Sequence, residues 1–212
     1  MIKAVLFDFG GVITTSPFDA FARYERERGL PDGLIRSINA TNPDDNAWAK
    51  LERSDVDADG FAELFAAEAA ERGHDVSGHD VLDLLAGDIR PQMVAALHRI
   101  RDAGLTVACL TNNFRPRSDT DRTAGYRSEV MALFHAVVES SVVGVRKPEP
   151  EFYRIALETI GAEPANAVFL DDLGVNLKTA RAMGMTTIKV VDPDEALREL
   201  GAIIGIDLVS AS

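Results

Sequence analysis

The sequence has 212 residues and a net charge of −12 at pH 7, with 46% hydrophobic and 26% charged residues. This composition is typical of an ordinary globular protein, and the length suits one domain with a sizeable insertion or two small domains. A surface this acidic argues against nucleic acid and anionic membranes as partners. It allows a small anionic substrate, because a local metal ion can reverse the sign of one pocket.

The chain opens with Met1-Ile2-Lys3 and then a short apolar run, Ala4 to Phe7, which predicts a buried strand. No signal peptide precedes this run, and no apolar run is long enough to span a membrane, so we expect a cytoplasmic protein. The only cysteine, Cys109, lies inside a later apolar run and excludes an internal disulfide.

From about Phe18 to Ala86 the sequence has helical periodicity and no convincing strand. The helices expected there are Phe18 to Arg28, Asp32 to Ala40, Asp45 to Leu51, Gly60 to Arg72 and Gly78 to Ala86. We predict a helical cap domain over residues 17–87, inserted after the first strand. Residues 1–16 and 88–212 would then form the core domain.

Beyond the insertion, apolar runs alternate with helical patterns that end at glycines. The further expected strands are Thr106 to Leu110, Ala136 to Val138, Ala167 to Leu170 and Thr187 to Val191. The expected helices are Pro91 to Ala103, Glu149 to Ile160 and Val175 to Met183. This alternation predicts an α/β fold with a doubly wound, Rossmann-like parallel sheet.

Polar side chains follow the expected strands, where ligands bind in a doubly wound sheet. They are Asp8 after the first strand, Thr111-Asn112-Asn113-Phe114 after the second, Lys147 beyond the third, and Asp171-Asp172 after the fourth. Each alone has an ordinary explanation as a cap, a turn or a solvated charge. Their order after successive strands favours a common site.

Three carboxylates close together repel one another unless a cation lies between them, and oxygen ligands of this kind suit Mg²⁺. A carboxylate beside Mg²⁺ can attack phosphorus and form an aspartyl phosphate. Lys147 and the Thr111 hydroxyl would stabilise charge on the transferring group. The residues therefore indicate phosphoryl transfer at Asp8.

This combination resembles the haloacid dehalogenase superfamily, whose motifs are an Asp nucleophile, a Thr or Ser, a Lys and an acidic pair. The insertion lies where that family carries its cap. Within the superfamily, the sequence is most similar to the N-terminal phosphatase-like domain of soluble epoxide hydrolases. The supporting stretches are Leu110 to Asn113, Lys147 to Pro150 and Phe169 to Lys178. No α/β-hydrolase segment follows here, so we do not expect epoxide hydrolysis.

The resemblance implies roles for the matching positions. The implied catalytic residues are Asp8, Thr111 and Lys147; the implied metal ligands are Asp8, the Gly10 carbonyl and Asp172, with Asp171 in support; the implied substrate-binding residues are Asn112, Asn113, Phe114 and Asn176. The implied cofactor is Mg²⁺ and the implied ligand a small phosphorylated substrate. Family members with helical caps often pair, so a homodimer is also expected.

One position departs from the family pattern. Phosphatases of this superfamily carry a second Asp two residues after the nucleophile, as general acid and base, and here that residue is Gly10. Losing a general acid costs roughly 10²–10⁴ in rate. Three hypotheses stay open: a phosphatase for substrates with good leaving groups, a dehalogenase-type enzyme that attacks carbon, or a catalytically weak binding or assembly module. The acidic pair weighs against the second.

A dense charged segment, residues 115–122, follows the second motif. It is compatible with a solvated loop, a substrate gate or a subunit contact, and the sequence does not choose among these.

Overall fold

The computed structural model describes residues 1–85, 87–113 and 124–209. Its core is a five-stranded parallel sheet in the order β3-β2-β1-β4-β5. The strands are β1 (Ala4–Phe7), β2 (Thr106–Thr111), β3 (Ala136–Glu139), β4 (Ala167–Asp171) and β5 (Thr186–Lys189). All four residues of β1 are buried, as expected for a central strand covered on both faces. The predicted α/β, doubly wound fold is confirmed.

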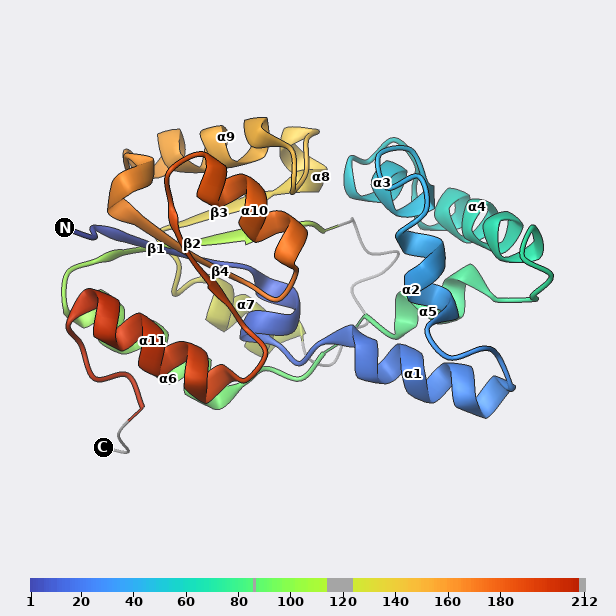
Figure 1. The fold of residues 1–212 in the computed structure, drawn as a ribbon, viewed down its shortest axis with the longest axis horizontal. Coiled ribbons are helices and arrows are strands. Elements are labelled where there is room, and N and C mark those ends of the chain that lie inside the picture. Colours follow the sequence, from blue (N-terminus) through green and yellow to red (C-terminus); the bar gives the residue numbers. More distant parts are fainter. Residues whose placement is uncertain (86, 114–123, 210–212) are drawn as a thin grey trace.

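Helices cover both faces of this sheet (Figure 1). The helices of the sheet-bearing part are α6 (Pro91–Asp102), α7 (Ala124–Met131), α8 (Ser140–Val143), α9 (Pro150–Ile160), α10 (Gly174–Ala182) and α11 (Pro193–Ile204), with a short 3-10 turn at Pro164–Asn166. Side chains of α6 and α11 share one apolar cluster with one face of the strands, and those of α9 and α10 share a second cluster with the other face. The helices therefore shield the sheet and leave its carboxyl ends free for a site.

A second group of helices lies beside the carboxyl ends of the strands (Figure 1). It consists of α1 (Pro17–Arg28), α2 (Leu34–Asn39), α3 (Ala47–Glu52), α4 (Ala58–Ala70) and α5 (Gly78–Asp83). These helices build an apolar cluster of their own, centred on Phe61 and Phe65. The two chain connections to them meet at an antiparallel bridge between Thr14 and Ile89. We call this group the cap; its exact domain boundaries stay a prediction.

Buried capping interactions fix the cap helices locally. The carboxylate of Glu25, 1% exposed, accepts hydrogen bonds from the backbone N–H groups of Gly33 and Ile35 at 2.7 and 2.8 Å. It thereby satisfies otherwise unpaired donors at the start of α2. Asp57 accepts a bond from the Gly60 N–H, so α4 begins at Ala58, two residues before the expected start.

The helices α7, α8 and α11 were not predicted from the sequence, and the last strand is shorter than predicted. β5 ends at Lys189, and the expected terminal residue Val191 is 79% exposed. The side chain of Asp192 then accepts a bond from the Glu195 N–H at 2.9 Å and starts α11. In the described part of the chain, no helix has the length and apolar character needed to cross a membrane.

Candidate active site

The strand register brings Asp8 and Asp171 to the same edge of the sheet. β1 pairs in parallel with β4, with Phe7 opposite Leu170, so the residue after Phe7 lies beside the residue after Leu170. The backbone N–H of Asp8 donates to the carbonyl of Leu170 at 2.9 Å. The buried Thr111 ends β2, the other neighbour of β1. The predicted convergence of these side chains is therefore observed.

Lys147 joins the two aspartates. Its Nζ lies 2.8 Å from Asp8 Oδ1 and 3.0 Å from Asp171 Oδ2, and its side chain is 1% exposed. A buried ammonium of this kind is stable only where carboxylates compensate its lost hydration. We refer to Asp8, Lys147 and Asp171 as the strand-end cluster.

The charges of the strand-end cluster do not balance. Burial raises the pKa of Asp8 well above its ordinary value; Lys147 acts against this shift and Asp171 adds to it. Burial alone would lower the pKa of Lys147, but the carboxylates of Asp171 and Asp8 outweigh burial and raise it. The lysine therefore stays charged at neutral pH, but it does not compensate both carboxylates, and the pKa of Asp8 stays raised.

Asp171 is fully engaged by protein donors. Its carboxylate accepts hydrogen bonds from the Leu173 N–H at 2.7 Å and from the Asn176 Nδ2 at 3.0 and 3.1 Å, besides Lys147. Asn176 was predicted to bind substrate, which stays a prediction; in the structure its buried side chain donates to Asp171. This geometry fits the supporting role expected for Asp171.

Asp172 is the more accessible member of the acidic pair. Burial, followed by the charge of Asp171, raises the pKa of Asp172 to about 6. Ser16 donates a long hydrogen bond of 3.5 Å to its Oδ2. Gly11 has a φ of 78°, and a Cβ there would lie 2.2 Å from Asp172 Oδ2, so the glycine lets this carboxylate approach the β1 loop.

The three aspartates form a candidate metal site. Asp8, Asp171 and Asp172 each offer a carboxylate oxygen within 4.8 Å of the others. An all-oxygen donor set with unbalanced negative charge fits Mg²⁺, which uses few carboxylates and keeps water or phosphate oxygens as its other ligands. The Gly10 carbonyl as a further ligand stays a prediction.

Gly10 leaves space where the superfamily's second Asp would lie. Its backbone has a φ of −69° and a ψ of 129°, which any residue can adopt. A Cβ built there would have no atom within 4 Å. The missing carboxyl group is therefore a property of the sequence and not a steric demand of the fold.

The two asparagines after β2 are engaged by the protein. Asn112 Nδ2 donates to the carbonyl of Lys147 at 3.0 Å, and Asn112 Oδ1 accepts from the Lys147 N–H at 2.9 Å. The Asn113 side chain bonds to Glu139 and Ser141. Substrate binding by either residue stays a prediction. Phe114 and the charged segment 115–122 lie outside the described residues.

The structure adds site neighbours that the sequence did not indicate. Glu52, the last residue of α3, accepts a hydrogen bond from Asn112 Nδ2 at 3.0 Å and lies 2.9 Å from Arg146 Nε. Periodicity placed Glu52 next to the end of a helix, but no sequence signal connects it to residues far along the chain. Ser16 is a similar case: it caps α1, and no pattern along the sequence connects it to Asp172.

Comparison with known proteins identifies the family of this chain. The family model for haloacid dehalogenase-like hydrolases matches residues 2–184. The chain is 34% identical over 97% of its length to mouse acyl-CoA dehydrogenase family member 10, and 30% identical over 98% to pig bifunctional epoxide hydrolase 2. It covers only 19% and 40% of those proteins, so it spans less than half of either. It is also 27% identical over 96% of its length to the sesquiterpene phosphatase astK of Aspergillus oryzae, of which it covers 97%.

Solved structures share the fold. The L-2-haloacid dehalogenase of Xanthobacter autotrophicus superposes with a TM-score of 0.62 at 25% identity, covering 95% of this chain and 83% of that one. A HAD-family enzyme of Bacteroides thetaiotaomicron, in complex with magnesium and inorganic phosphate, has a TM-score of 0.60 at 20% identity, covering 89% and 94%. The predicted resemblance is confirmed, and this chain belongs to the haloacid dehalogenase-like hydrolase family.

Proposed function

We propose that this hydrolase is a magnesium-dependent phosphatase of a small phosphorylated metabolite and acts through an aspartyl phosphate at Asp8. The observation that carries the proposal is the strand-end cluster with Asp172 beside it. One buried lysine neutralises only part of three converging carboxylates, whose oxygens lie within 4.8 Å of one another. A site with this charge suits a divalent cation and, through it, an anionic phosphoryl group.

Hydrogen bonds to one oxygen of Asp8 support its assignment as the attacking carboxylate. Its Oδ1 accepts hydrogen bonds from the Phe9 N–H at 2.6 Å and from Lys147 Nζ at 2.8 Å. The other oxygen, Oδ2, is the one we assign as nucleophile. It attacks phosphorus in line, a new O–P bond forms, and the bond from phosphorus to the leaving oxygen breaks, with the electron pair leaving on that oxygen.

The residues around Asp8 divide the remaining tasks. Lys147 lowers the pKa of the nucleophile against the effect of burial and offers positive charge to the phosphoryl oxygens. The Thr111 hydroxyl lies at the end of the neighbouring strand. Asp8 and Asp172 would hold Mg²⁺, with Asp171 orienting Lys147. The ion would supply charge that neutralises the transferring phosphoryl group.

The absence of a carboxyl group at Gly10 favours substrates with good leaving groups. With no carboxyl group at this position, the leaving oxygen must depart without a proton from that residue. An acyl phosphate or a sugar 1-phosphate tolerates this loss better than a simple alkyl ester, whose alkoxide is a poor leaving group. In the second step, water attacks the phosphorus of the aspartyl phosphate, its proton passes to solvent, and inorganic phosphate and free Asp8 result.

The relatives support a phosphatase without identifying the substrate. The Aspergillus relative of nearly the same length is a sesquiterpene phosphatase, and a solved structure with the same fold, from Thermococcus onnurineus, is a HAD phosphatase. The small metabolite and the homodimer stay proposals.

The test is phosphate release from a panel of esters with Mg²⁺, including sugar 1-phosphates, acyl phosphates and aryl phosphates of graded leaving-group acidity. We expect turnover that rises steeply with leaving-group acidity and is abolished by a chelator and by Asp8→Asn. Absence of turnover on every ester, with folded and magnesium-loaded protein, would overturn the phosphatase assignment.

Gly10 also supports a second candidate, a catalytically weak binding or assembly module. That module would bind inorganic phosphate with Mg²⁺ but release none from any ester. A dehalogenase-type attack on carbon is less compatible with this site, because carbon displacement needs no metal ion and Lys147 alone would then compensate three converging carboxylates.

A further inference from the structure

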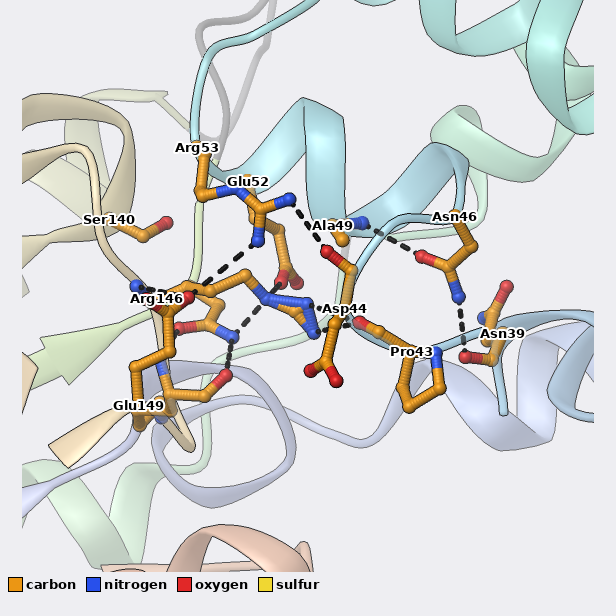
Figure 2. Close-up of polar contacts among 12 residues, drawn as sticks. Asn39, Pro43, Asp44, Asn46, Ala49, Glu52, Arg53, Ser140, Arg146 and Glu149 are labelled. Atoms are coloured by element: carbon orange, nitrogen blue, oxygen red, sulfur yellow. Dashed lines mark hydrogen bonds and ion pairs between the residues drawn. The ribbon is translucent and has the colours of Figure 1, made fainter. Parts of the chain in front are cut away.

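Two ion pairs join the cap to the core next to the candidate active site. Glu52 of the cap pairs with Arg146 of the core at 2.9 Å, and Arg53 of the cap pairs with Glu149 of the core at 3.6 Å. Figure 2 shows these four side chains reaching toward one another across the boundary. We refer to Glu52, Arg53, Arg146 and Glu149 as the seam cluster.

The seam cluster is reinforced by backbone contacts. Both terminal nitrogens of the Arg146 guanidinium donate to the carbonyl of Pro43 in the cap at 3.3 Å. Ser54, at the end of α3, donates to the carbonyl of Ser141 at 3.2 Å. The end of α3 is therefore fixed against the segment that carries Lys147.

Glu52 differs from the other seam residues because it contacts Asn112. A primary amide has two N–H donors, and both donors of Asn112 are used, one by Glu52 Oε2 and one by the Lys147 carbonyl. The amide oxygen accepts from the Lys147 N–H. Asn112 therefore holds Lys147 at both backbone groups, and Glu52 accepts from the same Nδ2 group in the same orientation of the amide.

The position of Lys147 matters because its ammonium lies between two carboxylates. Its contacts with Asp8 and Asp171 are 2.8 and 3.0 Å, and a displacement of its backbone would lengthen at least one of them. Misplacement of a catalytic group by about 1 Å can cost on the order of 10²-fold in rate.

We propose that Glu52 is a positioning residue: through Asn112 and Arg146 it sets Lys147 in place, so that the strand-end cluster is complete only with the cap seated. The inference rests on the proposed phosphatase function for its catalytic consequence, but the link from Glu52 to Lys147 is a structural property of the chain. Removing Glu52 loosens Asn112 and Lys147, whereas removing Arg53 loosens the seam without touching Asn112.

The test compares Glu52→Met, which removes the acceptor at similar volume, with Glu52→Gln, which keeps an acceptor oxygen. Arg53→Met is the matched control from the adjacent residue. It loses an ion pair to the core and also a 2.8 Å bond to the Asp44 carbonyl and a 3.1 Å contact with Asp55. General loosening of the cap would therefore affect Arg53→Met at least as much.

Two readouts are measured for each variant. The first is hydrogen exchange at the Lys147 backbone amide, which needs no activity and which we expect to accelerate about tenfold in Glu52→Met. The second is kcat and KM for the best ester of the panel with Mg²⁺, where we expect kcat to fall about tenfold with KM nearly unchanged. Glu52→Gln should recover most of both losses, and Arg53→Met should change neither by more than about twofold.

If the Lys147 amide of Glu52→Met exchanges hydrogen at the wild-type rate, the inference is overturned. It is also overturned if Glu52→Met and Arg53→Met change the exchange rate and kcat equally. Faster exchange with an unchanged kcat would overturn the catalytic part. If the wild-type protein releases no phosphate from any ester, the proposed function fails while the exchange comparison still decides the link between Glu52 and Lys147.

Discussion

The strand-end cluster and the seam cluster both consist of ion pairs, but the protein holds them differently. In the strand-end cluster, Lys147 and Asp171 are 1% and 0% exposed, and Asp171 follows directly from the register of β1 and β4. In the seam cluster, Glu52 and Arg146 are 18% and 13% exposed and come from a helix end and a loop. The sheet therefore fixes the two aspartates of the strand-end cluster, whereas Lys147 and the seam cluster depend on loops and on the packing of the cap against the core.

This difference sets what each cluster can do. Buried charges cannot be compensated by water, so the strand-end cluster must keep its partners or bind a cation. A pair that keeps some contact with water loses less hydration than a fully buried one and depends less on its partner. We therefore assign the chemistry to the strand-end cluster and the positioning of Lys147 to the seam cluster.

The largest expected effect breaks the strand-end cluster at its nucleophile. Asp8→Asn keeps the size of the side chain but removes the attacking carboxylate, so we expect kcat for phosphate release to fall by at least about 10⁴-fold. The seam cluster should stay intact in this variant, and an unchanged thermal unfolding midpoint would show this. Residual turnover above one-hundredth of wild type would place the nucleophile elsewhere.

The second prediction compares the stability lost on replacing two adjacent residues, Lys147 of the strand-end cluster and Arg146 of the seam cluster. Lys147→Met leaves Asp8 and Asp171 facing each other without a cation, and we expect it to lower the free energy of unfolding by about 3–5 kcal/mol. Arg146→Met breaks a partly exposed pair and should cost about 1 kcal/mol. Urea unfolding at pH 7 without Mg²⁺ measures both, and equal losses would contradict the distinction between the clusters.

A third substitution introduces, beside the strand-end cluster, the carboxyl group that is missing at position 10. Because Gly10 has room for a side chain, Gly10→Asp should raise turnover of esters with poor leaving groups by about 10²-fold. It should also flatten the dependence on leaving-group acidity. Gly10→Asn is the control with the same shape and no acidic proton, and a similar gain in that variant would exclude general acid catalysis as the cause.

The smallest effect concerns the contact between the β1 loop and Asp172. Gly11→Ala forces an alanine into a positive φ and its Cβ onto the Asp172 carboxylate, so we expect a loss of about 1–3 kcal/mol in unfolding free energy. The variant should also bind Mg²⁺ more weakly, measured by calorimetry. Wild-type magnesium affinity would argue against Asp172 as a ligand.

The strand-end cluster could be predicted because its signals are local. Apolar runs of a few residues mark the strands, and Asp8, Thr111 and Asp171 follow them directly, so the parallel arrangement alone brings them together. Lys147 lies on a loop, and it was identified by its place beyond the third expected strand and by the resemblance to the superfamily.

The seam cluster could not be predicted because its signals are not local. Helical periodicity marks α3, yet the pairing of Glu52 with Arg146 depends on how the cap packs against the core, and no pattern along the chain encodes that. The same holds for the amides of Asn112 and Asn176. Their residue types fit substrate binding equally well, and only the folded structure shows that they hold Lys147 and Asp171.

The most direct test of the account is the stereochemical course at phosphorus, followed with an isotopically chiral thiophosphate ester hydrolysed in labelled water. Each in-line displacement inverts the configuration, so attack by Asp8 followed by attack by water predicts net retention. Net inversion would mean that water attacks the substrate directly, and it would contradict a covalent intermediate at Asp8.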